Sequence, residues 1–181
     1  GTDGANALID EYANAPTAEA RKTCLDALRD LRRTYDALFA LARDVDPPVV
    51  RLAAVILGDL GEPKGEELLV EMLQHTDANA RRSAVAALSR FPSDRALEAL
   101  GVSSRDEAAL VRARAVAGLI ARRDLRAVPL LAPLLDGEDD REVLYAAIEG
   151  LGALGGAEAV QLLIRCAQGE GEHPLRRTAA Y

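Results

Sequence analysis

The side chains best suited to nucleophilic or metal chemistry in this sequence are the thiols of Cys24 and Cys166 and the imidazoles of His75 and His173. A nucleophile needs a base held beside it, and a metal site needs several ligands at short, characteristic spacings. No two of these four residues share such a spacing. We therefore predict no catalytic residue, no metal site and no cofactor.

The amino-acid composition argues against two classes of binding partner, nucleic acids and membranes. The 181 residues carry a formal charge of −7, contain no Trp and include only 3% aromatic residues. A nucleic-acid binder usually presents a basic stripe and stacking aromatics, so we expect no nucleic-acid partner. The longest apolar run, residues 128–135, contains two prolines and is far shorter than the roughly 20 residues that span a bilayer. No signal-peptide pattern opens the chain, so we expect a cytoplasmic protein with no membrane partner.

The cysteines and histidines lie in a sequence that repeats along the chain, and the repeated segments must position them. The string D-A-N-A-R-R-S-A-V-A-A-L at residues 77–88 is nearly rewritten as T-A-E-A-R-K-T-C-L-D-A-L at residues 17–28. The phrase ends each time on an anchor leucine, and the gaps between anchors are 29, 31, 31 and 32 residues. A small residue stands four positions before each anchor. The anchors are Leu28, Leu57, Leu88, Leu119 and Leu151, and the small residues are Cys24, Ala53, Ala84, Ala115 and Ala147.

A second set of leucines follows the anchors by twelve residues, at Leu69, Leu100, Leu131 and Leu163. Glycine-bearing breaks such as L-G-D-L-G separate the two sets, and glycine is favoured just past a helix end. Each unit is thus predicted to be a helical hairpin that buries its apolar stripe against the next hairpin. We predict hairpins over 17–43, 46–74, 77–101, 106–136 and 140–168, a second helix of a partial repeat over 5–14, and the start of a further repeat over 173–181. All would form one array over 1–181, cut from a longer chain.

One repeat of this sequence is similar to a known repeat family. The pattern D-x-x-x-V-R-x-x-A-x-x-x-L-G is matched, with small shifts, by Asp46, Val50, Arg51, Ala54, Leu57 and Gly58. It resembles the short HEAT repeat, and is closest to the HEAT-like repeats first associated with phycobilin lyases. The resemblance implies an all-α, right-handed superhelical solenoid of armadillo type, with about twelve helices. First helices would lie on its convex side and second helices on its concave side.

Two classes of enzyme have a fold that resembles the one expected here. Metal-dependent HEAT hydroxylases carry several His-Glu pairs as iron ligands, whereas the two histidines here occur as His75-Thr76 and His173-Pro174. HEAT-like DNA glycosylases need a basic groove with aromatics and a carboxylate. The only clearly basic stretch, residues 77–105, has five Arg against three acids and no Trp. The resemblance therefore favours neither chemistry. The position of Cys24, in a slot otherwise filled by Ala, indicates a small core residue.

Basic residues recur six positions before the anchors, at Lys22, Arg51, Arg82 and Arg177, with Arg112 one residue off. Equivalent positions of adjacent repeats lie side by side. This row could bind a partner, or it could form an inter-repeat ladder in which Arg bonds the neighbouring unit's carbonyls or its capping Asp. The sequence favours the ladder.

The second helices offer the remaining candidate surface. Residues two before and two after each second leucine should project from the concave side. In chain order, these residues are first acidic, then apolar with two prolines, and finally polar and slightly basic. Pro133 should kink its helix or restart it. We predict a non-enzymatic scaffold that binds a partner protein or peptide on this concave side, with a basic segment as the candidate ligand. The alternatives are a chromophore-lyase-like or other enzyme-assisting subunit, and a spacer between domains. The predicted partner-binding residues are Glu67, Glu71, Glu98, Gln161 and Arg165, beside Val102, Pro129 and Pro133.

Overall fold

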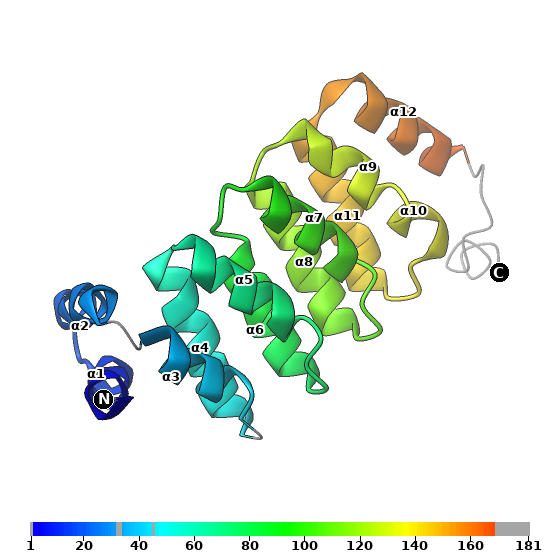
Figure 1. Ribbon diagram of the computed structural model, residues 1–181. Coiled ribbons are helices and arrows are strands. Elements are labelled where there is room, and N and C mark those ends of the chain that lie inside the picture. Colours follow the sequence, from blue (N-terminus) through cyan, green and yellow to red (C-terminus); the bar gives the residue numbers. More distant parts are fainter. Residues whose placement is uncertain (1, 32–33, 45, 169–181) are drawn as a thin grey trace. The chain divides into compact units, whose positions relative to one another are not determined.

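The computed structural model describes residues 2–31, 34–44 and 46–168, and within them every regular element is a helix (Figure 1). The predicted all-α class is therefore confirmed. The predicted segment over 173–181, with His173 and Arg177, lies outside the described residues. None of the helices in the described ranges is long and apolar enough to cross a membrane.

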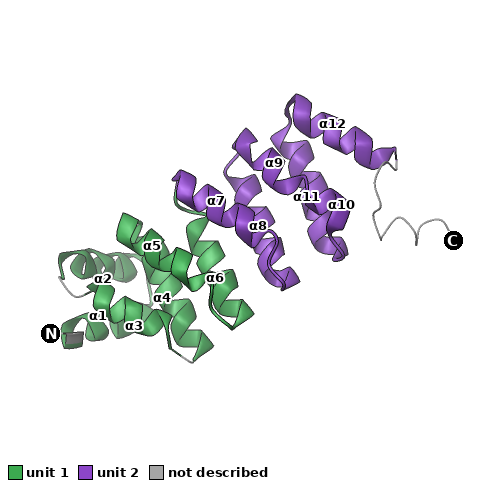
Figure 2. Cartoon of the chain, turned by 45° about the vertical axis from the view of Figure 1, so that its right-hand side comes forward, with its two compact units in different colours: residues 1–91 green, residues 92–181 purple. Residues whose placement is uncertain are grey.

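The chain divides into two compact units, residues 1–91 and 92–181 (Figure 2). The division falls inside the hairpin predicted over 77–101, and the single array over 1–181 stays a prediction. Unit 1 contains α1 (Thr2–Asn14), α2 (Ala18–Asp30), α3 (Thr34–Ala42), α4 (Pro47–Leu60), α5 (Pro63–Met72) and α6 (Ala78–Leu88). Unit 2 contains α7 (Asp94–Ser103), α8 (Ala109–Ala121), the 3-10 helix η1 (Leu125–Ala127), α9 (Val128–Leu131), α10 (Leu134–Gly137), α11 (Arg141–Leu154) and α12 (Gly156–Ala167).

We call α2, α4, α6, α8 and α11, which end on or contain the anchor leucines, the first helices. The helices that follow them, α3, α5, α7, η1 with α9 and α10, and α12, are the second helices. Within unit 1, α4 packs on α6, and α2 packs on α1 while also touching α4. Within unit 2, α8 packs on α11, and each of them also contacts a second helix. The helices are thus paired along the chain within each unit.

The cores of both units are built from the repeated apolar positions. All five anchor leucines are fully buried, and the small residues four positions before them are at most 3% exposed. Leu69, Leu100 and Leu131 are also fully buried, whereas Leu163 is partly exposed on α12. α12 is the last described helix, and only Ala159 among its residues is buried.

Local signals explain where the first helices begin and end. Asp77 accepts a hydrogen bond from the Ala80 backbone N–H at 2.8 Å, and Thr17 and Asp140 cap their helices in the same way. This bond satisfies one of the backbone donors left open in the first turn. Gly61 ends α4 at φ 68°, in the left-handed region that glycine enters without a Cβ penalty. Pro133 separates α9 from α10, so this second helix restarts as predicted.

Within the described ranges, the predicted arginine ladder was assigned to the wrong residues except at Arg112. The bonding arginines lie seven positions before the anchors, and they reach back to the loop that precedes their own helix. Arg81 donates to the carbonyls of His75 at 2.9 Å and Thr76 at 3.1 Å. Arg112 donates to the equivalent carbonyls of Asp106 and Glu107, and Arg21 to that of Ala15. One residue along a helix turns a side chain by about 100°. Lys22, Arg51 and Arg82 therefore face solvent instead.

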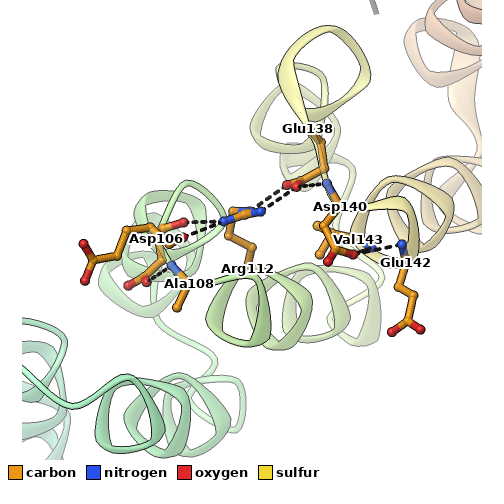
Figure 3. A network of polar contacts seen from close by, with 8 residues as sticks. Asp106, Ala108, Arg112, Glu138, Asp140, Glu142 and Val143 are labelled. Atoms are coloured by element: carbon orange, nitrogen blue, oxygen red, sulfur yellow. Dashed lines mark hydrogen bonds and ion pairs between the residues drawn. The ribbon is translucent and has the colours of Figure 1, made fainter. Parts of the chain in front are cut away.

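In unit 2 one of these arginines also joins two loops (Figure 3). Arg112 binds Glu138 through two parallel hydrogen bonds, of 2.7 Å from Nε and 2.6 Å from Nη2. The Glu138 side chain is only 2% exposed, and it also accepts from the Asp140 backbone N–H at 2.8 Å. Asp140 in turn caps α11 through Glu142 and Val143. The hydrogen bonds to Glu138 raise the pKa of the Arg112 guanidinium further, so the guanidinium stays charged.

We expect Leu88→Ala to destabilise unit 1 by about 2–5 kcal/mol, because it leaves a cavity at a fully buried position. Urea unfolding followed by circular dichroism measures this loss. The matched control is Val102→Ala, at a side chain 69% exposed, which should change stability by less than about 0.5 kcal/mol. Equal unfolding curves for Leu88→Ala and the parent would show that this leucine is not a core residue.

We expect Arg112→Ala to destabilise unit 2 by about 3–5 kcal/mol, because it leaves the buried Glu138 carboxylate without its partner. Thermal and urea unfolding report the change. Arg114 on the same helix is exposed, and Arg114→Ala should leave both midpoints near those of the parent. A similar loss in both variants would mean that the ion pair contributes nothing specific.

Candidate functional site

Of the cysteines and histidines that the structure describes, Cys24 and His75 lie in unit 1 and Cys166 lies in unit 2. Cys24 is buried in its helix, and burial raises the pKa of its thiol. Cys166 lies on α12 and is partly exposed. The Nδ1 atom of His75 accepts a hydrogen bond of 3.0 Å from the Asp77 backbone N–H, which gives this imidazole a structural role. Within the described ranges, no three His, Cys, Asp or Glu side chains are placed to hold a metal ion.

The predicted residues Glu67 and Glu71 occupy one exposed face of α5, four positions apart. Residues at this spacing lie one above the other on a helix. Glu71 is 3.5 Å from the guanidinium of Arg43, which follows α3. The Arg43 guanidinium in turn lies 3.8 Å from the centre of the Phe39 ring. An acidic face and an aromatic side chain thus meet where α3 contacts α5.

A pocket of about 190 Å³ opens at this meeting point. Its floor is apolar, because Ala42, Leu68 and Met72 are buried there. Its rim is polar and includes Glu71. Sequence reasoning predicted Glu71 but missed the pocket. The spacing of Phe39 and Arg43, one turn apart near the end of α3, was the available signal. The lining residues are Phe39, Ala42, Arg43, Leu68, Glu71, Met72, Gln74 and His75.

The other predicted residues lie in unit 2. Glu98 is exposed on α7, one turn before Val102, and Gln161 and Arg165 share an exposed face of α12. Arg165 donates to Asp136, near the end of α10, at 3.4 Å. Pro129 and Pro133 are exposed as well. The structure thus brings Gln161 and Arg165 together, and brings Glu67 and Glu71 together in the other unit. The gradient of charge along the whole array stays a prediction.

A second, wider groove of about 590 Å³ lies in unit 1 between α1, α2 and the first helix α4. Sequence reasoning did not predict it. The Tyr12 hydroxyl donates to the Asp59 carboxylate, which also pairs with Arg90. Burial and this carboxylate raise the pKa of Tyr12 above its usual range, so its hydroxyl stays a donor. The lining residues are Tyr12, Ala13, Arg21, Pro48, Arg51, Leu52, Val55 and Asp59.

Solved structures with this fold include an interacting subunit pair and a peptide complex. The complex of CpcE and CpcF of phycocyanin lyase from Nostoc sp. PCC7120 matches with a TM-score of 0.60 and 16% identity, over 83% of this chain and 99% of that one. A designed armadillo repeat protein in complex with the peptide (KR)4 matches with a TM-score of 0.53 and 17% identity, over 96% of this chain and 95% of that one.

An engineered protein matches with a TM-score of 0.55 and 22% identity, over 92% of this chain and 78% of that one. At these identities the likeness shows the fold alone. No curated protein matches the sequence.

The family is shown by sequence. The model for HEAT repeats matches residues 35–109 and 101–181, which together cover most of the chain. The matched ranges include the buried anchor leucines from Leu57 to Leu151 and the arginine-bonded loops before α6 and α8. The chain belongs to the HEAT-repeat family.

Proposed function

We propose that the chain is a non-enzymatic interaction module whose second helices bind a basic segment of a partner protein. The observation that carries this proposal is that α5 presents two exposed acids, Glu67 and Glu71, and also forms one side of the apolar pocket that it shares with α3. Charge would attract and orient the segment, and the pocket would hold one of its apolar side chains. The enzyme-assisting alternative has no comparable observation on the second helices.

Charge supplies the orientation. Glu67 and Glu71 project from the same face of α5, and both are exposed. Complementary charges accelerate encounter and fix the register of a bound segment more than they add affinity. A lysine or arginine of the partner would compete with Arg43 for Glu71, since that existing pair is exposed and therefore weak.

The pocket supplies the anchor. Its volume of about 190 Å³ is below the roughly 300–1,000 Å³ of small-molecule sites, so it suits one side chain rather than a chromophore. Interfaces often depend on a few side chains that fill such pockets while a polar rim excludes water. Leu68, Met72 and Phe39 offer the apolar contact here.

Two structures of similar fold support this kind of role. The designed armadillo repeat protein is in complex with a peptide of alternating basic residues, (KR)4, and CpcE is in complex with a second subunit, CpcF. In unit 2 the exposed residues Glu98, Gln161 and Arg165 would add contacts of their own. Several weak contacts along one chain raise the overall affinity.

Fluorescence anisotropy with labelled (KR)4 tests the charge. We expect Glu67→Lys plus Glu71→Lys to weaken binding by about tenfold or more, because two attractions become repulsions. The matched control is Glu142→Lys plus Glu149→Lys, which makes the same change of charge at two exposed positions of the first helix α11. It should bind nearly as the parent does. Equal loss in both double variants, or no binding to the parent, would contradict the proposal.

A peptide change tests the pocket without altering the protein. Replacing one arginine of (KR)4 by leucine should keep or raise affinity, by up to about tenfold, since burying a leucine contributes roughly 1.5–3 kcal/mol. A surface that recognises charge alone would bind this peptide more weakly than (KR)4. That result would remove the pocket from the proposal.

A further inference from the structure

We propose that the first helices of unit 1 form a second binding site, for an acidic and partly apolar segment of a protein. The site consists of the basic surface, defined as Lys22, Arg51 and Arg82 on α2, α4 and α6, and the groove of about 590 Å³ that Arg51 borders. It uses different helices and the opposite charge from the second-helix site, and it does not rest on that proposed function.

The basic surface follows the repeat. Lys22, Arg51 and Arg82 each stand six residues before an anchor leucine, and all three are exposed. α4 packs directly on α6, so Arg51 and Arg82 occupy equivalent places on adjoining helices. Where α2 touches α4, Arg29 donates to the Leu60 carbonyl at 3.2 Å and links the two helix ends.

These three cations are not used by the fold. The loop carbonyls are bonded by Arg21 and Arg81, one residue earlier. Lys22, Arg51 and Arg82 make no hydrogen bond or ion pair within the described ranges. An exposed cation without a partner can bind an incoming carboxylate without breaking an existing pair.

The local charge is positive although the chain carries −7. α4 and α6 contain one acidic residue between them, Asp59, and it is already engaged by Arg90 and by the Tyr12 hydroxyl. On α2, Asp26 pairs with Arg29 at 2.8 Å. Glu19 and Asp30 balance the two remaining cations of α2, so the net positive charge lies on α4 and α6. An acidic segment would therefore meet attraction from α4 and α6 that no carboxylate there offsets.

The groove adds an apolar component. Val55 is 41% exposed and lies one turn after Arg51 on α4. Pro48 and Leu52 also line the groove, so an aliphatic side chain beside a carboxylate would fit this lining. Arg21 also lines this groove, and it donates to the Ala15 carbonyl through Nη1 only, so its other guanidinium N–H groups remain available there.

An acidic protein segment suits these features better than a nucleic acid. A nucleic-acid site uses many phosphate contacts and aromatic stacking platforms. Tyr12, the aromatic residue at this groove, is buried and bonded to Asp59. A groove with Val55 and Leu52 instead favours a segment that mixes carboxylates with aliphatic side chains.

Anisotropy with a labelled peptide of repeated Asp-Ala-Leu-Glu units tests the site. We expect the parent to bind it, with affinity that falls as salt is added. Arg51→Glu plus Arg82→Glu should weaken binding by about tenfold or more, and Val55→Ser by about threefold. All three side chains are exposed and the arginines have no described partner, so circular dichroism should show folded variants.

The control is Arg105→Glu plus Arg141→Glu, the same change of charge at two exposed positions of unit 2. It should bind the acidic peptide nearly as the parent does. The Arg51 and Arg82 double variant should also keep its response to (KR)4, which separates this site from the second-helix site. Equal loss in both double variants would overturn the proposal, as would tighter binding of an oligothymidylate than of the acidic peptide.

Discussion

The close approach of adjacent first helices is the constraint on which the rest of the structure depends. A Cβ added at Gly58 of α4 would lie 3.0 Å from the Cβ of Ala87 on α6, and one added at Gly150 of α11 would overlap Ile120 of α8. Small residues therefore set the spacing, and the anchor leucines fill the space that remains. Since interiors pack as densely as crystals, a larger side chain at Gly58 would press on Ala87 and its backbone, and one at Gly150 would require Ile120 to shift. Cys24 is also buried in this slot, since its side chain is larger than that of alanine by only one heavy atom.

Once the helices are this close, the loops between repeats must satisfy their carbonyls without help from a neighbouring strand or sheet. Arg21, Arg81 and Arg112 do this by reaching back five or six residues, and Arg112 also holds Glu138. A buried polar group without a partner is costly, so these arginines belong to the fold. The basic residues one position later are left to solvent. The same short motif thus contains a structural cation and a surface cation.

Unit 1 consequently presents two chemically different surfaces. The second helices carry acids beside a small apolar pocket, and the first helices carry unpartnered cations beside a wider groove. Each combines a charge with apolar lining, which is the usual composition of a protein-binding surface. A repeat can provide both because its two helices expose different faces and contribute separately to the core.

The sequence by itself determined the helical class, the position of the anchor leucines and the HEAT resemblance, because helix periodicity and burial follow from local residue order. It also placed Glu67 and Glu71 on one exposed face. It did not distinguish Arg81 from Arg82, since both occur in A-R-R-S and only the path of the preceding loop decides which one finds carbonyls. The pocket at Phe39 and the groove at Arg51 were likewise decided by tertiary structure. Each is made by side chains from separate helices, and no pattern within one helix records how those helices meet.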